Sequence, residues 1–371
     1  MMGGIYFANI LGSTASVLLT GFVLMNVLSI REMTNYLFAV GIIAALIPLV
    51  ISQSITRKAL IVHCVSLFCF TGVIFFSSNL FFHHFYEKLL FKTNYAQNPP
   101  LKYVVENNAG VIAVAQNDEV FGGGVYDGYF NIDPRHNLNG IWRAYAIPLF
   151  SQHPQNVLMI GLSSGSWAQV VANNPDVKRL TIVEINPGYL KLISKYNEIS
   201  SLLVNPKVNV IIDDGRRWLA RNKNKKYDLI VMNATFYWRS YTPFLLSKDF
   251  FQLIQQHLTD IGVFYFNTTS SLDAVKTVRS VFPHVNTLYN FAIASSKPLQ
   301  FDAENLKKHL LSYTINNKKI FDLNNAIDRI TIEEIMAIQK RGIVNQQTLE
   351  KTTKNAKIIT DDTFLICSGV S

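Results

Sequence analysis

Three long stretches without a charged residue lie within the first hundred positions. They run over residues 5–30, 35–55 and 59–82. Each is long enough to cross a hydrocarbon core of about 30 Å as a helix that rises about 1.5 Å per residue. A cleaved signal peptide is disfavoured, because the basic start is missing and three apolar stretches follow one another. The pattern predicts a transmembrane region of three helices over residues 1–92.

The hydrophobic period changes after residue 92. Residues 93–145 predict a linker and a small β region, because turn-forming residues separate short apolar runs. Between residues 146 and 299, short β-rich runs alternate with amphipathic helical stretches. This alternation predicts an α/β fold with a Rossmann-like, doubly wound and mostly parallel sheet. Residues 300–371 predict a polar C-terminal extension, in which 331–342 has helical spacing and a glycine stop.

Composition and charge narrow the range of partners. Hydrophobic residues make up 49% of the 371 positions, and the mean hydropathy is positive, as the predicted spans require. The net charge is +9, but the one tight basic cluster, at 221–226, has no interleaved aromatic residues. A solvated loop explains this cluster better than a nucleic-acid surface does. Three cysteines give no disulfide framework, which fits a reducing compartment.

Basic residues near the spans bear on orientation. Arg31, Lys88 and Lys92 share one side of the predicted membrane with the large domain, and Arg57 and Lys58 lie on the other. Because basic loops favour the cytoplasmic side, we expect a multi-pass protein of the inner, cytoplasmic membrane whose large domain faces the cytoplasm. The membrane is then one partner. The sequence leaves open a homo-oligomer and a transport role for the spans.

Glycine and polar residues follow four consecutive strands of the predicted sheet. They are Gly161, Ser163, Ser164 and Gly165 after the first strand, Glu184 after the second, Asp214 and Gly215 after the third, and Asn233 after the fourth. The carboxyl ends of parallel strands meet at one edge, which is where doubly wound sheets bind ligands. We therefore expect these residues to surround one small-molecule site.

The residue types at this edge suit an adenosine-type ligand. Gly161 and Gly165 permit a positive φ and a close approach of backbone to ligand, and the N-terminus of the following helix binds polar groups. Glu184 lies 19 residues after Gly165, a spacing typical of an acid that holds ribose hydroxyls. Asp214 is placed to meet an adenine amino group. Each acid taken alone could also cap a helix.

The loop lacks the marks of a phosphate site. No lysine follows it, and Ser163 replaces the second glycine of the dinucleotide-binding pattern. An adenosine ligand without a pyrophosphate therefore fits better. The pattern favours S-adenosylmethionine or its decarboxylated form as a co-substrate, with no metal.

Five segments give the chain a family resemblance. They are VYDGYFN at 125–131, VLMIGLSSGS at 157–166, VEINPGYL at 183–190, IIDDGRRWL at 211–219 and YDLIVMN at 227–233. In order and spacing the chain resembles the spermidine synthase family, in particular its membrane-attached bacterial members, over roughly residues 103–296. The resemblance implies the class I S-adenosylmethionine-binding fold. It also implies aminopropyl transfer in polyamine biosynthesis as the inherited activity.

The resemblance also marks departures from the family. The aspartate of the family's glycine loop would fall at Ser164, and the family's catalytic D-S-S-D segment falls on 233–236, which begins with Asn233. The acids that grip and deprotonate an attacking amine are thus substituted, and an asparagine is no base. Asp127 is the remaining candidate for a catalytic acid on the acceptor side. A turn role before Gly128 explains it equally.

Arginine and aromatic residues stand where the family covers its acceptor. Trp238 and Arg239 follow the fourth strand, and Arg135, His136 and Arg143 precede the nucleotide loop. An arginine there would repel a polyamine and suit a carboxylate or phosphate. The alternative is a structural pairing of Arg239 with Asp127 or Asp213.

Three functions stay open from the sequence. The first is a membrane-anchored transferase of the spermidine synthase type. The second is an S-adenosylmethionine-dependent methyltransferase that acts on an anionic or membrane-borne acceptor. The third is a non-catalytic sensor that binds the nucleoside and signals through the spans.

Overall fold

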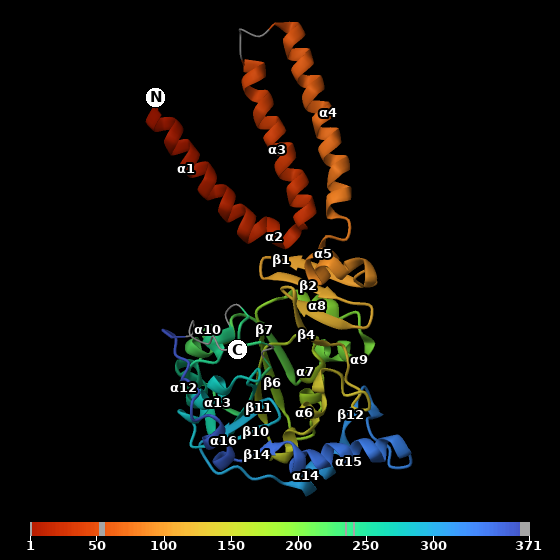
Figure 1. Ribbon diagram of the computed structural model, residues 1–371, viewed down its shortest axis with the longest axis vertical. Helices are drawn as coiled ribbons and strands as arrows, with labels where there is room; N and C mark the ends of the chain where they lie inside the picture. Colours follow the sequence, from red (N-terminus) through yellow and green to blue (C-terminus); the bar gives the residue numbers. More distant parts are fainter. Residues whose placement is uncertain (1, 52–55, 234–235, 240–241, 364–371) are drawn as a thin grey trace. The chain divides into compact units, whose positions relative to one another are not determined.

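The computed structural model describes residues 2–51, 56–233, 236–239 and 242–363 (Figure 1). The chain divides into two compact units, one of Met1–Asn117 with Phe121–Val125, and one of Asp118–Val120 with Tyr126–Ser371. Some predicted features fall outside the described residues: the end of the second span, two positions of the D-S-S-D equivalent, and the last residues of the C-terminal extension. The domain boundaries drawn from the sequence stay predictions.

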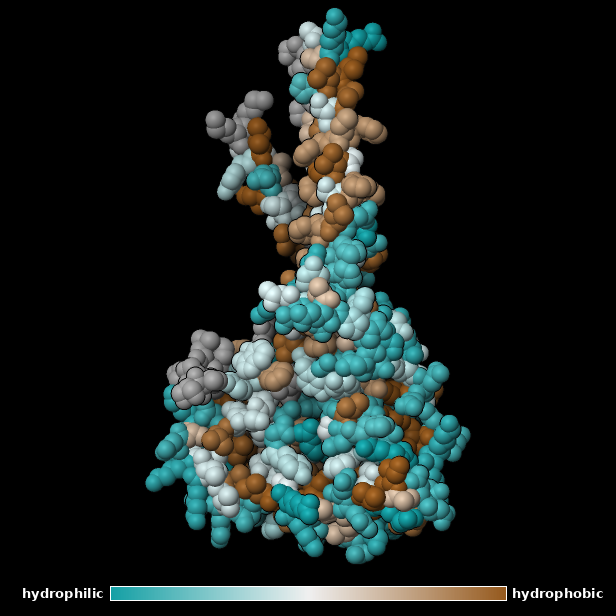
Figure 2. Space-filling model, turned by 45° about the vertical axis from the view of Figure 1, so that its right-hand side comes forward, coloured by the Kyte–Doolittle hydropathy of each residue, from teal (hydrophilic) through white to brown (hydrophobic). Residues whose placement is uncertain are grey.

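Long apolar helices open the N-terminal unit. They are α1 (Met2–Leu19), the π-helix η1 (Thr20–Leu24), α2 (Met25–Val27), α3 (Ile30–Ile51) and α4 (Arg57–Phe82). Three stretches, Gly3–Val27, Ile30–Ile47 and Arg57–Gln97, are long and apolar enough to cross a membrane, by length and composition only. Their large apolar side chains are mostly exposed, and apolar colour covers much of these helices in Figure 2.

The second apolar helix begins before the uncharged stretch that predicted it. Ser29 and Glu32 form a reciprocal capping box at the start of α3. The Ser29 N–H donates to Glu32 Oε2 at 2.7 Å, and the Glu32 N–H donates to Ser29 Oγ at 3.2 Å. These bonds satisfy backbone groups that the helix leaves unpaired at its start, so Arg31 lies in the first turn.

Short elements follow the apolar helices. They are α5 (Phe85–Phe91), η2 (Lys92–Gln97), β1 (Tyr103–Asn107), β2 (Gly110–Val114), β3 (Glu119–Gly122) and β4 (Val125–Tyr129). β1 and β2 form an antiparallel hairpin, in which Tyr103 pairs with Val114. The division between the two units runs through the next two strands. Short strands were expected in this part of the chain.

An eight-stranded mixed sheet is the framework of the C-terminal unit. Its strands are β5 (Asn156–Ile160), β6 (Arg179–Glu184), β7 (Val208–Ile212), β8 (Tyr227–Met232), β9 (Leu258–Asn267), β10 (His284–Leu288), β11 (Phe291–Ser295) and β14 (Ile343–Val344). Their order is β14-β10-β11-β9-β8-β5-β6-β7. The strands from β7 to β9 are parallel, and β11, β10 and β14 pair antiparallel with their neighbours. The predicted Rossmann-like α/β fold is confirmed.

Helices cover both faces of this sheet (Figure 1). One side carries α6 (Trp142–Tyr145), α7 (Ser166–Ala172), α8 (Gly188–Ile193) and α9 (Asn197–Ser200), and the other carries α10 (Gly215–Arg221), α12 (Lys248–Gln256), α13 (Leu272–Arg279) and α16 (Gln346–Thr352). The second group packs Phe250, Phe251 and Val278 against strand residues such as Phe264 in one apolar core. Full burial of such a side chain contributes about 1.5–3 kcal/mol. The core holds the strand ends, and therefore the site, in fixed register.

Short helical segments and a small hairpin connect these elements. They are η3 (Leu138–Gly140), η4 (Ile147–Leu149), η5 (Ser201–Val204), α11 (Thr242–Leu245), α14 (Ala303–Ser312), β12 (Thr314–Ile315), β13 (Lys318–Lys319) and α15 (Ala326–Arg341). Ser247 caps α12, because its hydroxyl accepts the Phe250 N–H at 3.2 Å. Gly342 follows α15, as the predicted glycine stop requires.

The segment after residue 299 takes part in the main sheet. β14 pairs with β10, with Ile343 opposite Leu288 and Val344 opposite Thr287. Helix α15 buries Ile332, Ile335 and Ile338 along one face. The helical spacing seen in the sequence therefore serves packing against the sheet domain.

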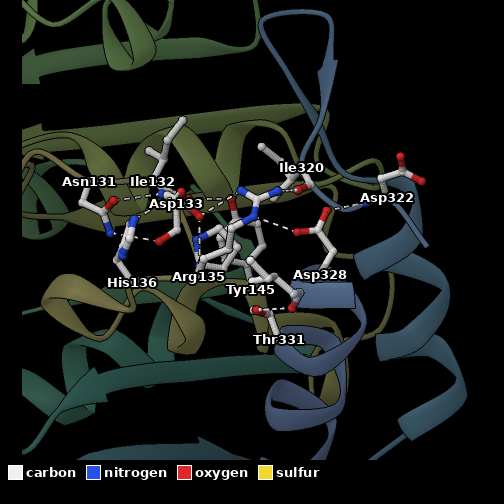
Figure 3. A network of polar contacts seen from close by, with 12 residues as sticks. Asn131, Ile132, Asp133, Arg135, His136, Tyr145, Ile320, Asp322, Asp328 and Thr331 are labelled. Atoms are coloured by element: carbon white, nitrogen blue, oxygen red, sulfur yellow. Dashed lines mark hydrogen bonds and ion pairs between the residues drawn. The ribbon is translucent and has the colours of Figure 1, made fainter. Parts of the chain in front are cut away.

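One ion-pair network ties α15 to the loop after β4 (Figure 3). Asp328, which is 1% exposed, accepts from Arg135 Nε at 2.7 Å and from the Asp322 N–H at 2.7 Å. Arg135 also donates to Asp133 at 3.0 Å and to the Ile320 carbonyl at 2.9 Å. A buried carboxylate with several donors stabilises the contact between α15 and this loop only while its arginine partner stays in place.

Replacing Asp328 with alanine is expected to lower the free energy of unfolding of the full chain by about 2 kcal/mol. The variant leaves Arg135 and the Asp322 N–H without their buried acceptor. Burial acts to raise the pKa of Asp328, but the hydrogen bonds from Arg135 and the Asp322 backbone, with the Arg135 charge, lower it overall. The stabilisation is therefore present above the ordinary aspartate pKa and is lost as the pH falls through the lowered one.

Thermal melting of the detergent-solubilised chain, followed by tryptophan fluorescence, measures this loss. Glu333→Ala is the matched control, because Glu333 is exposed on the same helix. Its effect should stay within about 0.5 kcal/mol. Equal melting of the two variants at neutral pH would show that the network does not stabilise the fold.

Candidate functional site

A tight glycine loop follows β5. Gly161, Ser163 and Gly165 all adopt a positive φ, of 88°, 49° and 76°. A Cβ on Gly165 would lie 2.8 Å from Ile193 Cδ1, so only glycine fits there, whereas a Cβ on Gly161 would meet nothing within 4 Å. The backbone at Gly161 therefore faces open space, as a loop that approaches a ligand requires.

Glu184 ends β6 and holds this loop. Its Oε2 accepts the Leu162 N–H at 2.6 Å, its Oε1 accepts the Asn186 N–H at 2.7 Å, and the residue is 4% exposed. Burial raises the pKa of the Glu184 carboxyl to about 7, although hydrogen bonds from the Asn186 and Leu162 backbones oppose the rise and the Asp127 charge adds to it. The structure thus brings the acid and the glycine loop together, as the sequence predicted.

The third group of predicted site residues lies at the end of β7. Asp214 caps α10, because its side chain accepts the Arg217 N–H at 2.7 Å. Asp213 accepts from Arg217 Nε at 2.6 Å, and its own N–H donates to the Glu184 carbonyl at 3.1 Å. A Cβ on Gly215 would lie 2.6 Å from Ile160 Cγ2, so glycine here lets α10 approach β5. The contact of Asp214 with adenine stays a prediction beside this capping role.

Ser164 belongs to a buried hydroxyl network. It is 2% exposed, and its Oγ donates to Ser166 Oγ at 3.0 Å. Ser166 in turn donates to the Tyr129 carbonyl at 2.8 Å and accepts the Asn131 N–H at 3.0 Å. These bonds fasten the loop to the end of β4, and no carboxylate takes part in them.

Asp127 lies in an ion pair beside the loop. Arg239 Nη1 donates to its Oδ1 at 2.7 Å, and the Tyr189 hydroxyl donates to its Oδ2. Burial acts to lower the pKa of Arg239, but the Asp127 charge leads the interactions that raise it overall. Of the two structural pairings considered for Arg239, the one with Asp127 is observed. Asp213 pairs with Arg217 instead.

The aromatic residue of the acceptor loop is largely open. Trp238 is 59% exposed and stacks on Phe236, with ring centroids 5.0 Å apart. Arg135 and His136 do not join this part of the site. Arg135 pairs with Asp133 and Asp328, and His136 lies 3.9 Å from Asp133. These contacts give Arg135 and His136 a structural role.

A chain of asparagine side chains starts at Asn233. Its Oδ1 accepts from Asn267 Nδ2 at 3.2 Å, and Asn267 Oδ1 accepts from Asn290 Nδ2 at 2.8 Å. Asn290 Oδ1 accepts from Arg143. The sequence did not single out the second and third asparagines. For Asn267 the sequence carried a signal, which is a polar residue at the end of the apolar strand β9. For Asn290, in the turn before β11, the sequence carried no signal.

The arrangement can bind a nucleoside and hold a polar acceptor. Glu184 binds the glycine loop through the Leu162 N–H, Ser163 donates to the Asp127 carbonyl, and Ser164 accepts the Ser166 N–H. Within the described parts of the chain, no group of three or more His, Cys, Asp or Glu side chains is suited to a metal ion. The carboxylates, hydroxyls and amides present can accept and donate hydrogen bonds and position charge.

Comparisons with known proteins agree with this geometry. The family model for the spermine/spermidine synthase domain matches residues 145–322. The polyamine aminopropyltransferase of Desulforudis audaxviator is 28% identical over 186 residues, which cover 43% of this chain and 65% of the relative. That of Bacillus cytotoxicus is 29% identical over 194 residues, covering 49% and 65%. The chain thus spans less than two thirds of the length of these relatives.

Solved structures agree on the fold. A spermidine synthase in complex with the transition state analogue AdoDATO superposes with a TM-score of 0.53 and 17% identity, covering 69% of this chain and 88% of that one. The spermidine synthase of Thermotoga maritima gives a TM-score of 0.52 at the same identity. The shared domain, the matching relatives and the common architecture together support the spermidine synthase family for the sheet domain, over residues 145–322.

Proposed function

We propose that this chain is a membrane-attached aminopropyltransferase that uses decarboxylated S-adenosylmethionine. The observation that carries the proposal is the buried Glu184 carboxylate, which bridges the loop after β5 and the turn after β6. Ribose hydroxyls can donate to its remaining lone pairs. The likeness to the spermine/spermidine synthase domain and to polyamine aminopropyltransferases supports the aminopropyl donor over plain S-adenosylmethionine. The apolar helices support attachment to the inner membrane, with the catalytic-type domain in the cytoplasm.

The reaction is a nucleophilic substitution. The lone pair of the acceptor nitrogen attacks the propyl carbon that is bonded to the sulfonium. The carbon–sulfur bond breaks, and its electron pair moves to sulfur, which leaves as the neutral thioether 5′-methylthioadenosine. The new ammonium then loses one proton to water. Glu184 and the glycine loop orient the nucleoside part, so that binding supplies the alignment of the reacting atoms.

Asp127 is the acceptor-side carboxylate in this proposal. Its carboxylate already pairs with the Arg239 cation and accepts from the Tyr189 hydroxyl. We therefore assign it to accepting a hydrogen bond from the attacking amine rather than to removing the proton. Asn233 can orient the same amine through its amide oxygen.

The product assay tests the proposal directly. The full chain in detergent, given decarboxylated S-adenosylmethionine and a panel of amines, is expected to release 5′-methylthioadenosine in a one-to-one ratio with an aminopropylated amine. Chromatography with mass detection measures both products. Methyl transfer from S-adenosylmethionine with release of adenosylhomocysteine would favour a methyltransferase instead. Tight nucleoside binding without any transfer would favour the non-catalytic sensor.

Nucleoside binding is expected to depend on pH through Glu184. The ribose hydroxyls donate to the ionised carboxylate, and the free protein has a Glu184 pKa of about 7. The affinity for 5′-methylthioadenosine should therefore be constant above that pH and weaken about tenfold per unit below it. Calorimetry between about pH 5.5 and 8 checks the slope. Glu184→Gln should bind weakly and without the slope, and a flat profile in the unmodified chain would place the ribose elsewhere.

Asp127→Asn is expected to lower kcat/KM about 10- to 100-fold, because a charge-assisted hydrogen bond of about 1.5–3 kcal/mol is lost in the transition state. Binding of 5′-methylthioadenosine should change less than about threefold, since the nucleoside contacts stay in place. Tyr189→Phe is the matched control: it removes one partner of the same carboxylate but keeps the charge. Unchanged kcat/KM in Asp127→Asn would assign Asp127 to a turn role only.

A further inference from the structure

Arg143 is a cation that lies against two aromatic rings. Its guanidinium lies over the Phe291 ring at 4.7 Å from the centroid and over the Trp167 ring at 5.9 Å. These two rings stack on each other with centroids 5.1 Å apart, so they do not enclose the guanidinium, and its N–H groups remain for acceptors. Burial lowers the pKa of Arg143, but the side chain keeps its charge at any physiological pH.

The partners of Arg143 within the described residues are neutral. Nε donates to the Gly140 carbonyl at 3.2 Å, Nη2 to the Asn139 carbonyl at 3.5 Å, and Nη1 to Asn290 Oδ1. None of the ion pairs among these residues involves Arg143. Of the five N–H groups, one on each terminal nitrogen has no acceptor here. Two such groups form the fork that a carboxylate binds in a bidentate manner.

The contacts of Arg143 connect it to both acceptor-side positions. On one side Asn290 and Asn267 lead to Asn233 at the end of β8. On the other side Asn139 accepts from the Tyr126 hydroxyl at 3.2 Å, next to Asp127 in the chain. The cation is therefore linked by hydrogen bonds to Asn233, and Tyr126, the neighbour of Asp127 in β4, binds the same Asn139.

The charges of this group disfavour a polyamine. The carboxylate of Asp127 is neutralised by Arg239, and the resemblance to the family places Ser164 and Asn233 where its other acids would fall. Arg143 then leaves a net positive charge where a diamine would bring two more. Like charges at close range in a partly buried site are unfavourable, and an opposite charge is favoured.

We propose that the acceptor is an amine that carries a carboxylate, and that Arg143 binds this carboxylate through its two remaining N–H groups. The proposal rests on the proposed transferase function and names its substrate class. The amine at the other end of the acceptor supplies the lone pair for attack on the propyl carbon, and the carbon–sulfur electron pair goes to sulfur. The products are an N-aminopropyl amino acid, 5′-methylthioadenosine and one proton.

Calorimetry with a matched pair of probes tests this inference. The full chain in detergent is saturated with 5′-methylthioadenosine and titrated with 4-aminobutyrate or with 1,4-diaminobutane, which has the same carbon chain but an ammonium in place of the carboxylate. We expect 4-aminobutyrate to bind at least about tenfold more tightly. Tighter or equal binding of the diamine would overturn the proposal.

Variants assign the preference to Arg143. Arg143→Gln should lose at least about tenfold in affinity for 4-aminobutyrate and little for the diamine, and Arg143→Lys should keep part of the preference. Lys225→Gln is the matched control, because Lys225 lies over the Trp218 ring at 4.9 Å, away from the acceptor group. A preference that survives in Arg143→Gln, with nucleoside binding intact, would overturn the assignment.

The transfer reaction separates this inference from the proposed function. With decarboxylated S-adenosylmethionine and 4-aminobutyrate, mass detection should find the aminopropylated amino acid. Transfer to 1,4-diaminobutane alone would overturn the carboxylate inference and leave the transferase function standing. Failure of the nucleoside to bind, or of any acceptor to react, would instead count against the proposed function.

Discussion

The buried carboxylate of Glu184 is the contact on which the site depends. It accepts one N–H from the loop after β5 and one from the turn after β6, and it is nearly excluded from solvent. Removing it would leave two backbone donors unpaired and free the glycine loop from its neighbour. Because the same burial raises its pKa to about 7, one group fixes the loop and sets the pH at which a ribose could bind.

The charged residues on the acceptor side are arranged differently from those on the nucleoside side. Asp127 is the carboxylate of that group, and Arg239 already compensates its charge. Arg143 adds a cation whose described partners are neutral amide and carbonyl groups. A family fold that handles cationic amines would need the opposite balance. The likeness to the family therefore supports the nucleoside end of the proposed reaction more firmly than the acceptor end.

Much of the fold could be predicted from local patterns. The alternation of β-rich and amphipathic runs predicted the sheet, and three uncharged stretches predicted the apolar helices. The capping box at Ser29 and Glu32 was also in the sequence, and it explains why α3 starts before its uncharged stretch. The pairing of β14 with β10 could not be predicted, because a strand of two residues has no periodicity of its own.

The sequence by itself determined which residues follow the parallel strands, and hence the grouping of Gly161, Gly165 and Glu184, because strand direction places these positions at one edge. Only the tertiary structure decided the partners of the charges. Arg239 lies 112 positions from Asp127 and had two acids open to it, and the asparagine chain to Arg143 joins four separate segments. Such pairings depend on packing in three dimensions, which local spacing does not encode.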